Sequence, residues 1–96
     1  MISSISVIDF LKIQDKVNII DVRIVENFNR SHIPNAINIP SDLLLANPKK
    51  YLNFQDTYYI YCQKGLTSSK LCTLLRSQGY KAINIIGGYE EYILTK

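Results

Sequence analysis

The sequence predicts a three-layer α/β fold in which a central, mainly parallel sheet is covered by helices on both faces. Short apolar runs rich in β-branched and aromatic residues alternate along the chain with segments that carry helical spacing and capping residues. Isoleucine, leucine, valine and phenylalanine make up a third of the residues, enough for one hydrophobic core. The length of 96 residues suits one domain, residues 1–96.

The first half of the chain predicts short elements separated by turns. Ser6 and Asp9 form a capping box, so we expect a helix that runs to about Lys12. The run at 17–22 is β-branched and apolar, which is typical of a buried strand. The remaining elements expected here are a helical turn at 26–30, a strand at 36–39 closed by Pro40, and a short helix at 43–46 capped by Ser41 and Asp42.

The second half predicts a strand, a long helix, another strand and a final helix. We expect strands at 57–61 and 82–86, because both runs are apolar and rich in aromatic or β-branched residues. Between them, Thr67 or Ser68 is expected to cap a helix that reaches about residue 78, where Gly79 ends it. The buried stripe expected for this helix consists of Leu71, Cys72, Leu74 and Leu75. Gly87 and Gly88 turn the chain into a helix at 89–94.

Charge and composition exclude several classes of function. The net charge of +3 is carried by scattered basic residues, so we expect no nucleic-acid partner. No apolar run reaches membrane-spanning length, and the N-terminus lacks a signal-peptide pattern, so we expect a cytoplasmic protein without membrane association. Two cysteines ten residues apart and one histidine predict no zinc site, no metal and no cofactor. A monomer is the expected state.

Cys62 is the candidate nucleophile, because it follows a predicted strand directly and precedes a short loop and a helix. Ligand sites of parallel sheets lie beyond the carboxyl ends of the strands. The loop amides and the positive end of the helix are expected to favour the thiolate, and Lys64 to add positive charge at the rim. Gly65 permits a backbone conformation closed to other residues. Cys72, in contrast, lies in the middle of a predicted helix and is expected to be inert.

Four segments in this order resemble the rhodanese-like single-domain sulfurtransferases. They are Asp21-Val22-Arg23 with Glu26 and Phe28, then His32 through Pro40, then Tyr59 through Ser68 with the pattern C-x-x-G-x-[RST]-[SA], and finally Asn84 through Tyr89. Each segment alone is weak evidence, and the order and spacing of all four give the resemblance its weight. Thr67 occupies a position at which many members of this family carry arginine.

The resemblance implies a sulfurtransferase without metal or cofactor. Cys62 would take a sulfane sulfur from a small anionic donor such as thiosulfate, or from a protein persulfide, and pass it to cyanide or a thiol. The loop implied to bind substrate consists of Gln63, Lys64, Gly65, Leu66, Thr67 and Ser68. Asp21 and Arg23 are expected to form an ion pair or backbone anchor that shapes the pocket, and His32 is expected to bond the backbone around a turn.

Two other functions are compatible with a cysteine at this position. An anion-loop phosphatase or arsenate reductase would need an arginine after a longer loop. Here Thr67 and Ser68 stand where that arginine would be, and the next arginine is Arg76. The second alternative is a non-catalytic rhodanese-like module that binds a protein, relays sulfur or senses redox state. Formation of a persulfide with turnover would separate an enzyme from such a module.

Overall fold

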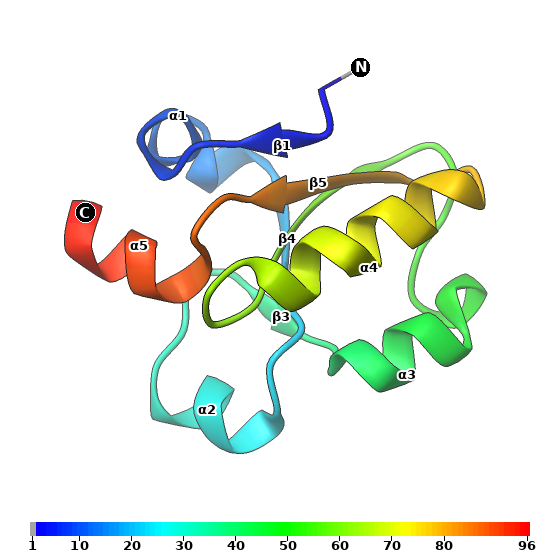
Figure 1. Cartoon of the computed structure of the whole chain (residues 1–96), viewed down its shortest axis with the longest axis horizontal. Helices are drawn as coiled ribbons and strands as arrows, with labels where there is room; N and C mark the ends of the chain where they lie inside the picture. The colour runs from blue at the N-terminus through cyan, green and yellow to red at the C-terminus, as the bar shows by residue number, and fades with distance from the viewer. Residues whose placement is uncertain (1) are drawn as a thin grey trace.

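The computed structural model describes residues 2–96 and contains a five-stranded sheet in these residues (Figure 1). Every pair of neighbouring strands is parallel, and the strand order is β1-β5-β4-β2-β3. The strands are β1 (Ser4–Ile5), β2 (Asn18–Asp21), β3 (Ile37–Asn38), β4 (Thr57–Tyr61) and β5 (Lys81–Ile85). The α-helices are α1 (Val7–Leu11), α2 (Val25–Arg30), α3 (Ser41–Ala46), α4 (Leu66–Ser77) and α5 (Gly88–Thr95), with 3-10 turns at Gln14–Lys16 and Pro48–Lys50.

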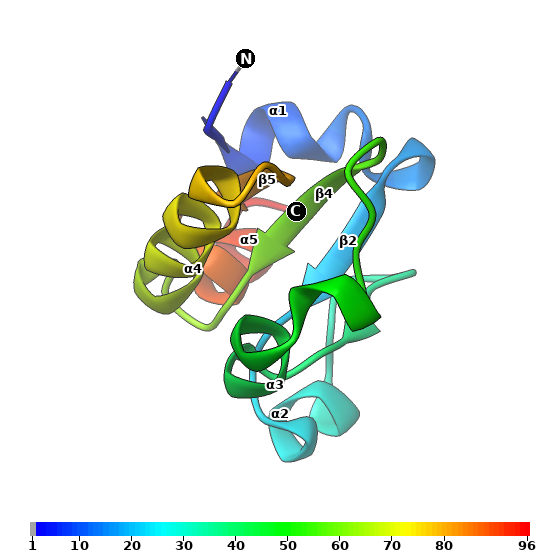
Figure 2. The same ribbon diagram turned by 90° about the vertical axis from the view of Figure 1, so that its right-hand side faces the viewer.

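The helices cover the two faces of the sheet, which confirms the predicted three-layer α/β architecture. Figure 1 shows α1 and α5 together at one end of the view and α3 and α4 together at the other, and Figure 2 shows α3 and α4 from their own side. Along β4 the side chains alternate between the two cores. Tyr58 and Ile60 pack under α3 and α4, whereas Tyr61 packs under α1 and α5. None of the helices in residues 2–96 has the length and apolar character that a membrane crossing requires.

Several local predictions were wrong, and the structure gives the reasons. β1 was missed because it has two residues, and it exists through bonds to β5 such as Asn84 N–H to the Ser3 carbonyl at 3.1 Å. Ser6 does cap α1 by accepting from the Asp9 N–H at 3.1 Å, but the Asp9 carboxylate pairs with Lys12 instead of closing a capping box. Ser41 is the first residue of α3 rather than its cap, which is Pro40.

The start of α4 also differs from the prediction. The residue before its first turn is Gly65, and neither Thr67 nor Ser68 acts as a side-chain cap. Leu71, Cys72 and Leu75 are buried as expected, but Leu74 is 45% exposed and lies outside the buried stripe. The helix therefore begins two or three residues earlier than expected, immediately after the loop that carries Cys62.

Candidate active site

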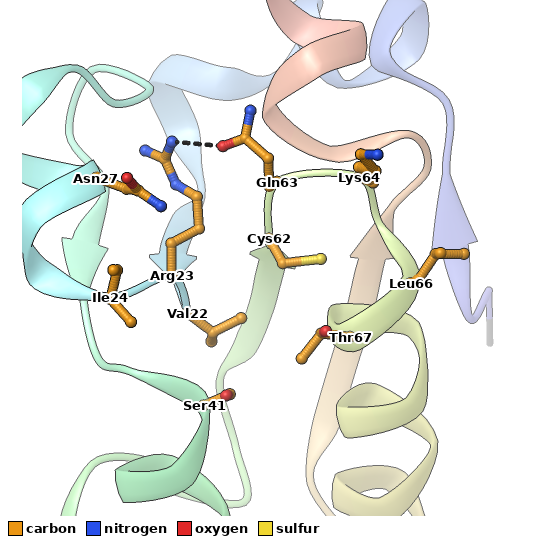
Figure 3. Close-up of a pocket in the computed structure, with 10 residues that line it drawn as sticks. All are labelled: Val22, Arg23, Ile24, Asn27, Ser41, Cys62, Gln63, Lys64, Leu66 and Thr67. Atoms are coloured by element: carbon orange, nitrogen blue, oxygen red, sulfur yellow. Dashed lines mark hydrogen bonds between the residues drawn. The ribbon is translucent and has the colours of Figure 1, made fainter.

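Cys62 lies at the carboxyl edge of the sheet, directly after β4. The loop from Cys62 to Gly65 connects β4 to α4, and the thiol faces the first turn of this helix (Figure 3). The residue is only 7% exposed, yet it lines a pocket of about 430 Å³. A thiol that borders an open pocket has the access to small molecules that a reactive cysteine needs.

The sulfur atom accepts two backbone hydrogen bonds. The N–H of Gly65 lies 3.1 Å from Sγ, and the N–H of Ser68 lies 3.3 Å from it. Both donors belong to the cap and first turn of α4, where backbone N–H groups have no partner within the helix and carry partial positive charge. The arrangement stabilises negative charge on Sγ, or on a group attached to it.

Gly65 is required by the geometry of this loop. Its φ of +88° lies in the left-handed region, and a Cβ at this position would lie 2.8 Å from the backbone nitrogen of Gly87. The first turn of α5 holds the loop from the same side. Tyr89 N–H donates to the Cys62 carbonyl at 2.9 Å, and Glu90 N–H donates to the Gln63 carbonyl at 3.0 Å. The glycine turn before α5 therefore supports the cysteine loop.

Asp21 and Arg23 form a buried ion pair at the end of β2. Nη2 of Arg23 lies 2.7 Å from Oδ2 of Asp21, and the side chains are 5% and 0% exposed. Burial acts to lower the pKa of Arg23, but the hydrogen bond and charge of Asp21 outweigh it, so this pKa is raised. Arg23 also donates to the Ser31 carbonyl at 2.7 Å and to Oε1 of Gln63 at 3.0 Å, and it lies 4.3 Å from the centre of the Tyr89 ring. The pair thus anchors the cysteine loop through Gln63.

The loop residues expected to bind substrate have different surroundings. Gln63, Lys64, Leu66 and Thr67 line the pocket, and Leu66 is 70% exposed. Ser68 is fully buried, and its hydroxyl donates to Oδ1 of Asn84 at 2.6 Å. Only the backbone N–H of Ser68 therefore faces the sulfur.

Four further residues line the pocket although the sequence did not name them as site residues. Val22 and Ile24 flank Arg23 after β2, Asn27 comes from α2, and Ser41 begins α3 (Figure 3). Val22 ends the strand predicted at 17–22 and Ile24 follows it closely, so their position at a strand end was a usable signal. Asn27 and Ser41 had none, because tertiary packing alone brings α2 and α3 to this edge.

His32 and Cys72 are not part of the pocket lining. His32 Nδ1 lies 2.8 Å from the Phe28 carbonyl, and its ring stacks on Phe28 with centroids 3.8 Å apart. Cys72 is fully buried in α4, and burial raises the pKa of its thiol to about 12. Within residues 2–96, no group of three or more histidine, cysteine, aspartate or glutamate side chains is placed to hold a metal ion.

Proteins with similar sequences include sulfur-handling proteins. The chain is 32% identical over 82 residues to the thiosulfate sulfurtransferase PspE of Escherichia coli, covering 80% of this chain and 75% of PspE. It is 32% identical over 79 residues to the putative sulfur carrier protein YrkF of Bacillus subtilis, covering 81% of this chain but 42% of YrkF. The chain thus spans less than half the length of YrkF.

Solved structures of other proteins have the same fold. SSP1007 from Staphylococcus saprophyticus superposes with a TM-score of 0.86 at 32% identity, covering 95% of this chain and 93% of that one. The human single-domain sulfurtransferase TSTD1 gives 0.87 at 24% identity over 100% and 99% of the two chains, which shows a common fold. The model of the rhodanese-like domain matches residues 6–95. The chain therefore belongs to the rhodanese-like domain family, which includes proteins that transfer sulfur.

Proposed function

We propose that this protein is a sulfurtransferase that carries a sulfane sulfur on Cys62. The single observation that supports this most directly is the position of Sγ, which borders a pocket of about 430 Å³ and accepts the N–H groups of Gly65 and Ser68 at 3.1 and 3.3 Å. These donors suit a thiolate and a persulfide anion equally, since both place negative charge at the same end of α4.

The reaction is written as two nucleophilic displacements. Cys62 thiolate attacks the outer sulfur of thiosulfate, the S–S bond of the donor breaks, and sulfite leaves with the bonding electron pair. With a persulfide donor, the leaving group is a thiolate. An acceptor, cyanide or a thiolate, then attacks the outer sulfur of the Cys62 persulfide and returns the electron pair to Sγ. No external oxidant or reductant is needed.

The residues around the pocket bear on which sulfur donor the protein would use. Thr67 lines the pocket where many relatives would present an arginine, so thiosulfate meets a hydroxyl there instead of a fixed positive charge. Lys64 also lines the pocket and is exposed, which allows it to approach an anionic donor. We therefore expect an organic or protein persulfide to load Cys62 faster than thiosulfate does.

Intact mass measurement after incubation with each donor tests the proposal. We expect the protein to gain the mass of one sulfur atom and to lose it again when a reductant is added. The reductant is needed because oxidation of the thiol by two oxygen atoms adds nearly the same mass but resists reduction. The gain should persist in Cys72→Ser and disappear in Cys62→Ser, so Cys72→Ser is the matched control. Absence of the gain with every donor would overturn the proposal.

A relay role is the second candidate, and the name of YrkF, a putative sulfur carrier protein, favours it. In that role Cys62 would pass sulfur between proteins without sustained turnover of small molecules. Steady-state thiocyanate formation from a sulfur donor and cyanide separates the two candidates. Many turnovers for each Cys62 indicate an enzyme, whereas a single stoichiometric transfer indicates a carrier.

A further inference from the structure

A second, smaller pocket adjoins the pocket at Cys62. It has a volume of about 210 Å³ and is lined by Arg23, Asn27, Arg30, Ser31, Gln63, Tyr89 and Ile93. Three of these residues, Arg23, Asn27 and Gln63, also line the pocket at Cys62. Figure 3 shows Arg23 and Asn27 on the side of Cys62 opposite Leu66 and Thr67, with the side chain of Gln63 bonded to Arg23. The two spaces therefore meet at the Arg23–Gln63 hydrogen bond, and we call the smaller one the Arg30 compartment.

The charges around both spaces are positive. Lys64 lines the larger pocket, Arg30 lines the smaller one, and no aspartate or glutamate lines either. Within residues 2–96, the ion pairs are Asp9 with Lys12 and Asp21 with Arg23, so neither Lys64 nor Arg30 is paired with a carboxylate there. An anion that entered from solvent would meet these two cations without competition from a protein carboxylate.

Arg23 offers one more donor at the boundary. Its Nε and Nη2 donate to Asp21 and Ser31, and Nη1 donates to Gln63 at 3.0 Å. Nη1 carries two hydrogens, and the second has no acceptor among residues 2–96. Because the Arg23 side chain is only 5% exposed, this donor belongs to a nearly buried, fixed guanidinium rather than to a mobile surface group.

We infer that the Arg30 compartment binds the carboxylate of an extended aliphatic thiol, or of its persulfide, while the sulfur of the same molecule reacts at Cys62. Arg30 supplies the charge, Asn27 and the free Nη1 hydrogen of Arg23 supply hydrogen bonds, and Ile93 and the Tyr89 ring supply apolar wall. Thiosulfate and cyanide are too compact to occupy both spaces at once. The inference rests on the proposed function in taking Cys62 as the reacting sulfur.

The exchange of an acid-bearing thiol with Cys62 is balanced without a further reagent. Its thiolate attacks the outer sulfur of the Cys62 persulfide, a new S–S bond forms, and the bond to Sγ breaks with its electron pair left on Sγ. The same binding geometry stabilises a mixed disulfide between Cys62 and the thiol. That species forms by ordinary thiol–disulfide exchange and needs no sulfurtransferase activity.

The test compares mixed-disulfide equilibrium constants of Cys62 for two series of thiols, ω-mercaptoalkanoates and ω-mercaptoalkanols with two, three, six or eight carbons. Intact mass reports the fraction of protein modified at each redox ratio, in the Cys72→Ser background. The variant is Arg30→Ala. Lys49→Ala is the matched control, because it removes the same charge from an exposed residue that lines neither space.

We expect the acid to be preferred over the alcohol by about fivefold at the chain length that reaches Arg30, the size of one ion pair at a partly exposed site. The preference should fall to about onefold in Arg30→Ala, weaken as salt is added, and persist in Lys49→Ala. Three outcomes would overturn the inference. The preference for the acid could be equal in Arg30→Ala and the parent protein, it could be the same at every chain length, or Cys62 could form no mixed disulfide. A persulfide that forms from thiosulfate while Arg30→Ala has no effect would leave the proposed function intact.

Discussion

Replacing Gly65 by alanine should damage both the fold and the site. Its φ of +88° costs a residue with a Cβ about 1–2 kcal/mol. The added Cβ would also lie 2.8 Å from the Gly87 nitrogen, which is backbone and must move as a unit with α5, and such overpacking typically costs about 1–3 kcal/mol. The free energy of unfolding should therefore fall by about 2–5 kcal/mol.

Gly79→Ala is the matched control, because the chain offers the same strain without the clash. Gly79 has a φ of +100°, but a Cβ there would meet only the Phe54 ring, at 3.5 and 3.6 Å, which is ordinary contact. We expect it to lose about 1–2 kcal/mol. In a domain of this size each kcal/mol corresponds to about 4–8 °C in Tm, so urea titration and thermal melts resolve the two variants.

The two variants should also differ at Cys62. Movement of residue 65 withdraws the N–H that lies 3.1 Å from Sγ, and a hydrogen bond to a charged group contributes about 1.5–3 kcal/mol. We expect iodoacetamide to alkylate Cys62 at least about tenfold more slowly in Gly65→Ala than in the parent protein, and at the parent rate in Gly79→Ala. The rates are compared at a temperature where circular dichroism shows that both variants are folded. Equal losses of stability together with equal alkylation rates would refute the reasoning.

Three further predictions concern buried polar groups. Tyr61→Phe removes the hydroxyl that accepts the buried Ile33 N–H at 3.1 Å, so urea unfolding should show a loss of about 1–3 kcal/mol; an unchanged midpoint would contradict this. Asp21→Asn leaves the buried guanidinium of Arg23 without its counterion, so the same titration should show a loss of about 3–5 kcal/mol, and a loss below 1 kcal/mol would count against a buried pair. Burial raises the pKa of Cys72 to about 12 from an ordinary value of 9.0, so above about pH 9 the unfolded chain releases this proton while the folded chain keeps it. Stability should therefore fall as pH rises above 9, and less steeply in Cys72→Ala; equal slopes would refute the assignment.

The predicted strands that match the structure are those whose own residues determine them. The run at 57–61 is β4 without correction, because its apolar, aromatic residues must be buried on both faces. β1 has two residues and no such pattern, and it is a strand only because it pairs with β5. The N–H groups of Asn84 in β5 and of Ile86 directly after it donate to the carbonyls of Ser3 and Ile5 at 3.1 and 2.9 Å. The existence of β1 depends on tertiary structure that the sequence does not display locally.

Some residues of the candidate site could likewise be predicted from local sequence features, whereas others are placed by tertiary packing. Cys62, Gly65 and the buried Asp21–Arg23 pair follow from strand ends and loop composition, which are local features. The opposite wall of the pocket, where Asn27 lies, comes from a six-residue helix whose position depends on how the chain packs after β2. A hydroxyl cap was the natural expectation for α4, but Gly65 precedes the helix because this position has a left-handed φ of +88° and lies against the backbone of Gly87.

The hydrogen bonds around the cysteine loop fix the conformation of this short segment. The carbonyls of Cys62 and Gln63 accept N–H groups from α5, and the Gln63 side chain accepts from Arg23. Any other loop conformation would leave these groups without partners, at about 1–3 kcal/mol for each one that stays buried. The N–H groups of Gly65 and Ser68 are therefore held at Sγ before a substrate arrives. The cost of ordering this site falls on folding rather than on substrate binding, so substitutions in α5 or β2 that displace the loop should alter Cys62 chemistry.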